Sequence, residues 1–315
     1  MAPSGTILVT GATGNVGREV IKELRSRRQR IVAAVLDDKD AQRAGDGVEK
    51  ISFDFGRPET FAPALAGIEK LFLMRPPQIA DVERYLHPVI DAAQTAGVKQ
   101  IVFLSLMGVN PRVPHYKVEQ KILASGIPYT FLRPSFFMQN LDTVYRDEIR
   151  VRDELFIPAG KARTSFIDVR DIGAVAGLTL AMDGHLNKAY ELTGSEALDY
   201  YEVADIFTKV QGRRISYLRP TPAEYAARQK TLGVQDEFID VMRSLYWTVR
   251  LGIGKRMTPE LRELLGRPPI TMAQYAVDFK ERFAAASLAE KAAARTLPRI
   301  NGPPRLVRPI VDQMR

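Results

Sequence analysis

The chain has 315 residues, of which 45% are hydrophobic and 26% charged, so it can build a full hydrophobic core. It contains no cysteine, which excludes a disulfide framework, a thiolate metal site and a cysteine nucleophile, and we predict no bound metal ion. The formal net charge is +8 at pH 7, and half of this excess lies in residues 284–315, where six Lys and Arg residues stand against two acidic ones.

The N-terminus lacks the basic region and apolar run of a signal peptide. No stretch approaches the roughly 18 consecutive apolar residues that a spanning helix needs. We therefore expect a cytoplasmic chain with no membrane span.

Apolar runs of strand length alternate with amphipathic helical patterns through the first half of the chain. The predicted strands cover residues 6–10, 31–36, 50–53, 70–74, 100–105 and 129–132. Runs such as IVFLS, joined by crossovers of helix length, are typical of parallel strands that are buried on both faces. The sequence therefore predicts an α/β fold with a doubly wound parallel sheet (Rossmann).

Beyond about residue 195 the pattern becomes mainly helical, as in YYEVADIFTKV, AEYAARQKTLG and DEFIDVMRSLYWTVRLG. After Arg295 the periodicity is lost and the composition shifts from Ala to Pro and Arg, which indicates an extension rather than a packed element. We predict a core over residues 1–155, the remaining core elements with a smaller, mainly helical C-terminal lobe over 156–283, and a basic extension over 284–315.

Three glycines follow the first predicted strand in VTGATGNVG at residues 9–17. They lie on the turn into a predicted helix, whose first N–H groups attract an anion. Gly11 would permit the tight turn, Gly14 would let a pyrophosphate approach the backbone, and Gly17 would let the helix pack closely on the strand. The acidic pair Asp37 and Asp38 ends the second strand about 20 residues later, as a dinucleotide-binding unit requires. We predict a phosphate-binding turn, and the alternative is a glycine-rich turn without a ligand.

The spacing is Gly-x-x-Gly-x-x-Gly, and with it the chain resembles the extended and atypical short-chain dehydrogenase/reductases and, more narrowly, the NmrA-like group. The resemblance covers residues 5 to about 283, and it is carried by VTGATGNVG (9–17), DAAQTAGVKQIVFLSLMGV (91–109), PHYKVEQKILASGIPYTFLRPSFFMQNL (114–141), SFIDVRDIGAVA (165–176) and YELTGSEALDYYEVADIF (190–207). This group includes quinone and triphenylmethane reductases, relatives that reduce plant phenylpropanoids, and dinucleotide-sensing regulators with no known turnover. The resemblance therefore implies the fold and an NAD(P)(H) cofactor, and it leaves the reaction open.

The resemblance also implies which residues hold the cofactor. Asp54 and Phe55 match the pair that contacts adenine, and the MRPP loop at 74–77 matches the loop along the cofactor ribose. Arg75 is unusual in that loop, and it either binds phosphate or substrate or faces solvent. The full set of implied residues is Gly11, Thr13, Gly14, Asn15, Val16, Gly17, Asp37, Asp38, Asp54, Phe55, Met74, Arg75, Pro76, Pro77, Ser105, Lys117, Pro134 and Phe136.

The position directly after the second strand bears on the choice of cofactor. The family usually has an arginine there that pairs with the 2′-phosphate of NADP, and this chain has Leu36. Asp37 or Asp38 would accept a hydrogen bond from a free ribose 2′-hydroxyl and repel a phosphate, which favours NAD(H). Lys39 and Arg43 weaken this inference, because a long basic side chain could still reach a phosphate. Alternatively, the two aspartates are solvated turn residues.

In the main short-chain family a Tyr-x-x-x-Lys pair moves the proton on the substrate oxygen, and this sequence has no such pair. Tyr116 is followed directly by Lys117, and neighbouring helical residues point roughly 100° apart. The catalytic candidates that remain are Ser105 and the cluster His115, Tyr116 and Lys117, in which Lys117 matches a lysine that some atypical reductases place near the nicotinamide ribose. The alternatives are a helix start for His115, packing for Tyr116 and a solvated position for Lys117.

Aromatic residues favour a flat, apolar substrate. In the family the segment FLRPSFFMQNL (131–141) passes the nicotinamide, so Phe136, Phe137 and Met138 would face the substrate, with at least one of them in the core. In the smaller lobe Tyr246 and Trp247 suit an aromatic pocket wall, although Trp247 equally suits packing.

Two functions from different classes follow. The first is an NAD(P)H-dependent oxidoreductase that reduces a small flat acceptor such as a quinone or a conjugated carbonyl. The second is a dinucleotide-binding redox sensor without turnover that reports to a protein partner. A small-molecule substrate is the expected partner and a homodimer is allowed. Nucleic-acid binding by the basic extension is disfavoured, because that segment lacks interleaved aromatic residues.

Overall fold

The computed structural model describes residues 5–291, which form two compact units. Unit 1 contains the chain up to Pro134 together with Val169–Leu192 and Thr258–Pro268. Unit 2 contains Ser135–Asp168, Thr193–Met257 and the described residues from Pro269 onward. The two units interleave along the chain, and unit 1 takes two segments from residues 156–283, the range to which the sequence analysis assigns the remaining core elements together with the smaller lobe. No helix among residues 5–291 is long and apolar enough to cross a membrane.

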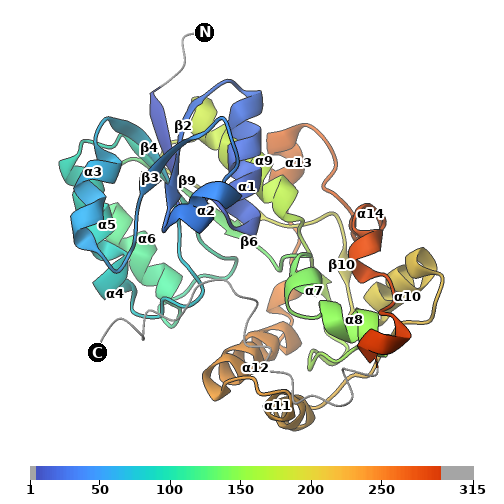
Figure 1. Ribbon diagram of the computed structural model, residues 1–315. Helices are drawn as coiled ribbons and strands as arrows, with labels where there is room; N and C mark the ends of the chain where they lie inside the picture. The colour runs from blue at the N-terminus through green and yellow to red at the C-terminus, as the bar shows by residue number, and fades with distance from the viewer. Residues whose placement is uncertain (1–4, 292–315) are drawn as a thin grey trace. The chain divides into compact units, whose positions relative to one another are not determined.

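Unit 1 is built on a seven-stranded sheet in the order β3-β2-β1-β4-β5-β6-β9, in which every neighbouring pair is parallel (Figure 1). Its strands are β1 (Thr6–Val9), β2 (Arg30–Val35), β3 (Glu49–Ser52), β4 (Ile68–Met74), β5 (Gln100–Leu104), β6 (Tyr129–Pro134) and β9 (Lys188–Leu192). The predicted doubly wound sheet is confirmed, and the ends of the first six strands lie within two residues of the predicted ones. The seventh strand, β9, was not predicted.

Helices cover both faces of this sheet. On one face α3 (Phe61–Leu65), α4 (Val82–Tyr85), α5 (His87–Thr95) and α6 (Pro114–Ser125) share one apolar core with the strands. On the other face α1 (Asn15–Ser26) contacts α9 (Val169–Ala181), which lies against β4, β5 and β6. The remaining elements of unit 1 are α2 (Asp38–Arg43), η1 (Pro58–Thr60) and α13 (Glu260–Leu265).

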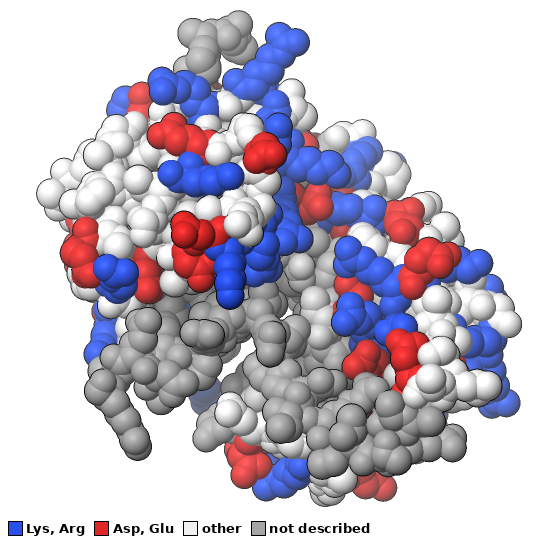
Figure 2. All heavy atoms as spheres, viewed as in Figure 1, with Lys and Arg blue, Asp and Glu red and all other residues white. Residues whose placement is uncertain are grey.

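The contact between α1 and α9 is close because α9 has glycine at two positions one turn apart. A Cβ atom at Gly173 would lie 2.4 Å from Glu19 Cβ, and one at Gly177 would lie 2.4 Å from Glu23 Cγ. A larger residue at either position would therefore separate the two helices. On the face shown in Figure 2, Lys and Arg side chains gather where α1 and α2 lie in Figure 1.

Unit 2 is mainly helical, as the sequence predicts, and has its own apolar core. Its helices are α7 (Asn140–Thr143), α8 (Arg146–Arg152), α10 (Tyr200–Gln211), α11 (Pro222–Thr231), α12 (Asp236–Arg250), η2 (Ile253–Lys255), α14 (Met272–Asp278) and η3 (Lys280–Phe283). Two short sheets pair β8 (Thr164–Ser165) with β10 (Ala197–Leu198) and β7 (Glu154–Leu155) with β11 (Ser216–Tyr217). Capping boxes formed by Asp199 with Glu202 and by Thr221 with Glu224 fix the starts of α10 and α11.

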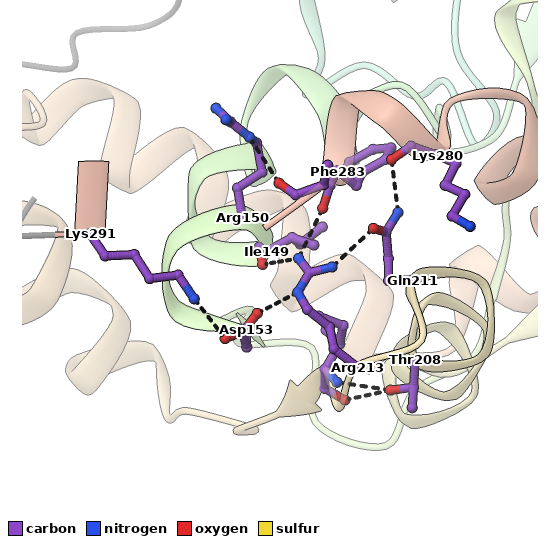
Figure 3. Close-up of polar contacts among 11 residues, drawn as sticks. Ile149, Arg150, Asp153, Thr208, Gln211, Arg213, Lys280, Phe283 and Lys291 are labelled. Atoms are coloured by element: carbon purple, nitrogen blue, oxygen red, sulfur yellow. Dashed lines mark hydrogen bonds and ion pairs between the residues drawn. The ribbon is translucent and has the colours of Figure 1, made fainter. Parts of the chain in front are cut away.

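Arg213 joins three segments of unit 2 (Figure 3). Its Nε donates to Asp153 Oδ1 at 2.6 Å, and its Nη2 donates to the carbonyls of Ile149 and Phe283 at 2.9 Å each. Lys291 Nζ lies 3.2 Å from the other carboxylate oxygen of Asp153. The first residues of the predicted basic extension are thus held against α8, and residues 292–315 lie outside the described part of the chain.

A carboxyl group is buried in unit 2 at Glu148 of α8. It is 7% exposed, and its Oε2 accepts a hydrogen bond from the Phe156 N–H at 3.1 Å. Burial raises the pKa of Glu148 from 4.5 to about 7, against the opposing attraction of Arg228. The folded chain therefore keeps a proton at Glu148 that the unfolded chain releases at a lower pH.

We expect this group to make the folded state less stable as the pH rises from 4.5 to about 7. The loss amounts to about 3 kcal/mol, because between these pH values the folded state binds a proton at Glu148 and the unfolded state does not. Glu148→Gln keeps a hydrogen-bond acceptor and removes the titration. In urea denaturation, the free energy of unfolding of Glu148→Gln minus that of the wild type should therefore increase as the pH rises across this range. Parallel pH profiles for the two proteins would contradict the expectation.

Candidate functional site

The glycine turn connects β1 to α1 and has the geometry that the sequence predicts for a tight turn. Gly11 has φ +62°, a left-handed conformation that favours glycine. Gly14 is the N-cap of α1, with φ −79° and ψ 173°, and its N–H donates to the Gly11 carbonyl at 2.9 Å. A Cβ atom at Gly17 would lie 2.1 Å from that same carbonyl oxygen. Gly17 is therefore needed where α1 packs on the turn itself, rather than on the strand.

The N-terminus of α1 offers donors to an anion. By helix geometry the N–H groups of Asn15, Val16 and Gly17 have no carbonyl partner within the helix, and the first turn contains no acidic residue. These donors and the helix dipole favour a phosphate group beside Gly14. A Cβ atom at Gly14 would meet only the Gly11 carbonyl oxygen, at 3.2 Å, so the turn has space next to this residue.

Thr10 fixes the loop after β4 next to the glycine turn. Its Oγ1 donates to the Phe72 carbonyl at 2.9 Å and accepts from the Met74 N–H at 3.0 Å. As a result, the sulfur of Met74 comes so close that a Cβ atom at Gly11 would lie 2.2 Å from it. Two segments of the predicted cofactor site, the glycine turn and the MRPP loop, thus lie side by side at the carboxyl end of the sheet.

Arg75 of this loop is bound to the loop itself. Its Nη1 donates to the carbonyls of Pro76, Pro77 and Ile79 at 3.2, 3.2 and 2.6 Å. Its Nε lies 3.4 Å from His115 Nε2, and burial lowers the pKa of the guanidinium. These contacts hold the loop in shape, and the roles that the sequence leaves open for Arg75 stay predictions.

The acidic residues after β2 and β3 make local contacts. Asp37 is the N-cap of α2, and its Oδ1 accepts from the Asp40 N–H at 2.9 Å. Asp38 is exposed in the first turn of the same helix. Asp40, which sequence reasoning did not select, accepts a hydrogen bond from Thr13 Oγ1 of the glycine turn at 3.2 Å. Asp54 accepts from the Gly56 N–H at 2.8 Å, which shapes its own turn.

Phe55 lies within that turn and packs its ring edge-on against Phe53, with the ring centroids 5.0 Å apart. It is only partly buried against the core, so one part of the ring is accessible. Phe55 therefore offers the accessible part of an aromatic ring for the predicted contact with adenine.

Ser105 belongs to a buried polar network at the carboxyl ends of β5 and β6. Its Oγ donates to Glu119 Oε1 at 2.6 Å, and Arg133 binds both oxygens of the same carboxylate, at 3.0 and 2.6 Å. Glu119 is 2% exposed, and its hydrogen bond raises the pKa of Arg133. Sequence reasoning missed Glu119, although a carboxylate between the apolar positions Val118 and Ile122 of one helix is a sign of a buried partner. The network fixes the orientation of the Ser105 hydroxyl.

His115, Tyr116 and Lys117 lie in the first turn of α6, with Pro114 at its start. Burial, and to a lesser extent the charge of Arg75, lowers the pKa of His115 to about 3, so its imidazole is neutral near pH 7. Its Nδ1 has no hydrogen-bond partner among residues 5–291. Lys117 Nζ lies 3.2 Å from Glu83 Oε1, and the two side chains are 51% and 60% exposed. The four catalytic candidates thus lie in one unit, and Ser105, His115 and Lys117 contact different residues.

The predicted substrate-facing residues belong to unit 2. Pro134, which was predicted to contact the cofactor, ends β6 in unit 1. Phe136 and Phe137 are partly buried, while Met138 is buried in the core, as expected for at least one of the three. Tyr246 is also buried, and its hydroxyl lies 2.7 Å from that of Tyr145, so it is a core residue. Trp247 is 59% exposed and is available to a ligand.

The parallel sheet and the glycine turn at the start of α1 define an NAD(P)-binding Rossmann-fold protein. The model of the NmrA-like family matches residues 3–275, and the chain belongs to this family. The resemblance proposed from the sequence is confirmed.

Curated relatives and solved structures agree with this assignment. The chain is 33% identical to an NAD(P)H azoreductase of Xenophilus azovorans over 287 residues, which cover 89% of this chain and 100% of the relative. It is similar to the NADPH complex of an NADPH-dependent quinone oxidoreductase from Escherichia coli, with a TM-score of 0.79, 28% identity, and 87% of this chain and 99% of that chain covered. It is also similar to the NADP(H) complex of a Citrobacter triphenylmethane reductase, with a TM-score of 0.77, 26% identity and the same coverage.

Proposed function

We propose that this NAD(P)H-dependent oxidoreductase transfers a hydride from the bound dinucleotide to a small, flat acceptor such as a quinone or a conjugated carbonyl. The observation that carries the proposal is the open helix N-terminus at Gly14 beside the MRPP loop, which suits a dinucleotide. The relatives support the kind of acceptor, because their names refer to an azo compound, a quinone and a triphenylmethane compound, which are all conjugated.

The reaction needs a proton as well as a hydride. With a quinone as acceptor, NAD(P)H and one proton give NAD(P)⁺ and a hydroquinone, so a group near the acceptor has to supply the proton to oxygen. Lys117 and Tyr116 are our candidates for this role. The low pKa of His115 argues against that residue as a stored proton near pH 7. Ser105, held by Glu119, would instead act as a hydrogen-bonding group of fixed orientation.

We also propose that the chain prefers NAD(H) to NADP(H). Both aspartates are exposed, but one Asp37 oxygen already caps α2, so Asp38 is the better candidate to accept a hydrogen bond from a free ribose 2′-hydroxyl. This carboxylate would favour NAD(H), as the sequence predicts. A cytoplasmic location and a homodimer also stay predictions.

The test is a panel of quinones, enones and azo dyes, each mixed with the protein and either NADH or NADPH while the loss of reduced dinucleotide is followed by its absorbance. We expect at least one acceptor to consume reduced dinucleotide in equal amount. If calorimetry shows that the dinucleotide binds and no acceptor oxidises it, the chain is better described as a dinucleotide-binding redox sensor than as an oxidoreductase.

A further inference from the structure

A pocket of about 500 Å³ opens beside the glycine turn, between α1 and the end of α2. We call it the α1–α2 pocket, and its lining residues are Ala12, Arg18, Ile21, Lys22, Arg25, Arg43 and Ala44. Four of these seven residues are cations and none is acidic. The pocket belongs to the region where Lys and Arg side chains gather in Figure 2.

The cations lie together because of helix geometry. Arg18, Lys22 and Arg25 are four and three residues apart, so they share one face of α1, and Arg43 reaches the same space from the last turn of α2. Like charges on one face repel each other, and this arrangement destabilises the chain slightly unless an anion occupies the pocket.

Two of the four cations, Arg18 and Arg25, have no carboxylate partner within the described part of the chain. The Arg18 side chain has no hydrogen-bond or ion-pair partner among residues 5–291. Lys22 is 76% exposed, and Glu19 lies 3.6 Å from it. Arg25 donates to the Asp46 carbonyl at 3.4 Å, which fixes its position without neutralising its charge.

Arg43, like Lys22, has a carboxylate partner, because its Nη1 lies 3.2 Å from Asp40 Oδ1. Asp40 also accepts the hydrogen bond from Thr13 of the glycine turn, and Ala12 of that turn lines the pocket. The pocket therefore shares a wall with the turn that would hold the pyrophosphate. Leu36 and Asp38, which decide the predicted choice of dinucleotide, are not among its lining residues.

We propose that the α1–α2 pocket binds a phosphomonoester dianion. A phosphate offers several acceptor oxygens and two charges, which match guanidinium groups better than a single carboxylate does. Ile21, Ala12 and Ala44 add an apolar lining against which a sugar or a base can pack. The volume suits a small molecule. The phosphate has two possible sources: the 2′-phosphate of NADP(H) on the neighbouring turn, or a separate phosphorylated small molecule.

The proposal rests on the proposed function only if the source is NADP(H), and its test therefore measures binding without any acceptor. The first variant is a triple variant that combines Arg18→Gln, Lys22→Gln and Arg43→Gln. Arg18→Gln alone is a second variant, since this side chain has no partner whose loss could disturb the fold. Arg30→Gln is the matched control, because Arg30 is an exposed cation at the opposite end of β2 from the glycine turn. The ligands for calorimetry at low ionic strength are inorganic phosphate, 2′,5′-ADP, 5′-AMP, NADPH and NADH.

We expect the wild type to bind 2′,5′-ADP, and the triple variant to bind it about 10-fold more weakly or worse, with a smaller loss for Arg18→Gln and none for Arg30→Gln. If NADPH loses affinity by the same factor while NADH and 5′-AMP do not, the source is the 2′-phosphate. If NADPH and NADH behave alike but inorganic phosphate and 2′,5′-ADP lose affinity, the source is a separate phosphorylated molecule. The proposal is overturned if the wild type binds neither phosphate nor 2′,5′-ADP, or if the control loses as much as the triple variant.

Discussion

Gly14→Asp should lower the affinity of the chain for NAD(P)H by about 100-fold or more, because a carboxylate a few ångströms from the pyrophosphate repels it in partly shielded surroundings. The fold should survive the change. Gly14 has φ −79° and ψ 173°, which any residue adopts, and the added Cβ atom meets only the Gly11 carbonyl oxygen at 3.2 Å. Aspartate is moreover a favoured N-cap residue, so α1 itself should gain stability.

The matched control is Gly14→Asn, which has nearly the same shape and the same capping ability without the charge. Titration calorimetry with NADH and NADPH should show a much smaller loss for asparagine than for aspartate, and neither variant should melt at a lower temperature than the wild type. Equal losses for the two variants would mean that side-chain bulk, and not charge, blocks the turn. Wild-type affinity in the aspartate variant would show that the glycine turn binds no pyrophosphate.

Lys117→Met should lower the single-turnover oxidation of saturating NADH by about 100-fold if Lys117 gives the proton to the acceptor, a usual size for a general acid. The same change should weaken dinucleotide binding by about 1 to 2 kcal/mol, the size of a lost charged hydrogen bond. The folded state should be little affected. The ion pair with Glu83 is exposed on both sides, and such pairs contribute less than about 1 kcal/mol.

Glu83→Gln is the control for this prediction, since it breaks the same ion pair and keeps the lysine. It should retain both turnover and affinity. If Lys117→Met matches the wild type in rate and affinity, Lys117 is a solvated helix residue, and Tyr116 or water supplies the proton. A loss of affinity with no acceptor reduced by either protein would favour the sensor.

The central sheet was predictable because its signal is local. Apolar runs such as those of β1 and β5 are buried along their whole length, and their composition alone indicates a strand. The missing strand β9 is at the edge of the sheet, where Lys188 and Ala189 are exposed, so its sequence KAYEL has no continuous apolar run. Which segments after residue 155 return to unit 1 was not predictable either, because the periodicity of α9 shows that it is buried but not that it packs on α1.

The candidate site also has a part that the sequence could predict and a part that it could not. The geometry of the glycine turn could be predicted because its residues are contiguous, and the spacing indicates that Gly11 and Gly17 have steric reasons to lack a side chain. The partners of Arg75 could not, since they are backbone carbonyls with no side-chain signature. The network of Ser105, Glu119 and Arg133 joins two strands and a helix, so only the fold brings these three residues together.

The close contact of α1 with α9 has a consequence for the synthesis of this protein. The glycine turn and α1 leave the ribosome early, whereas α9, with Gly173 and Gly177, emerges only after most of unit 1 has been made. Until then α1 lacks the helix that packs against it, so part of the surface of the nascent unit 1 that is buried in the folded protein is exposed to chaperones or to other nascent chains. Ribosome-bound chains that end before Val169 should therefore be protease-sensitive in their first 30 or so residues, whatever the supply of cofactor.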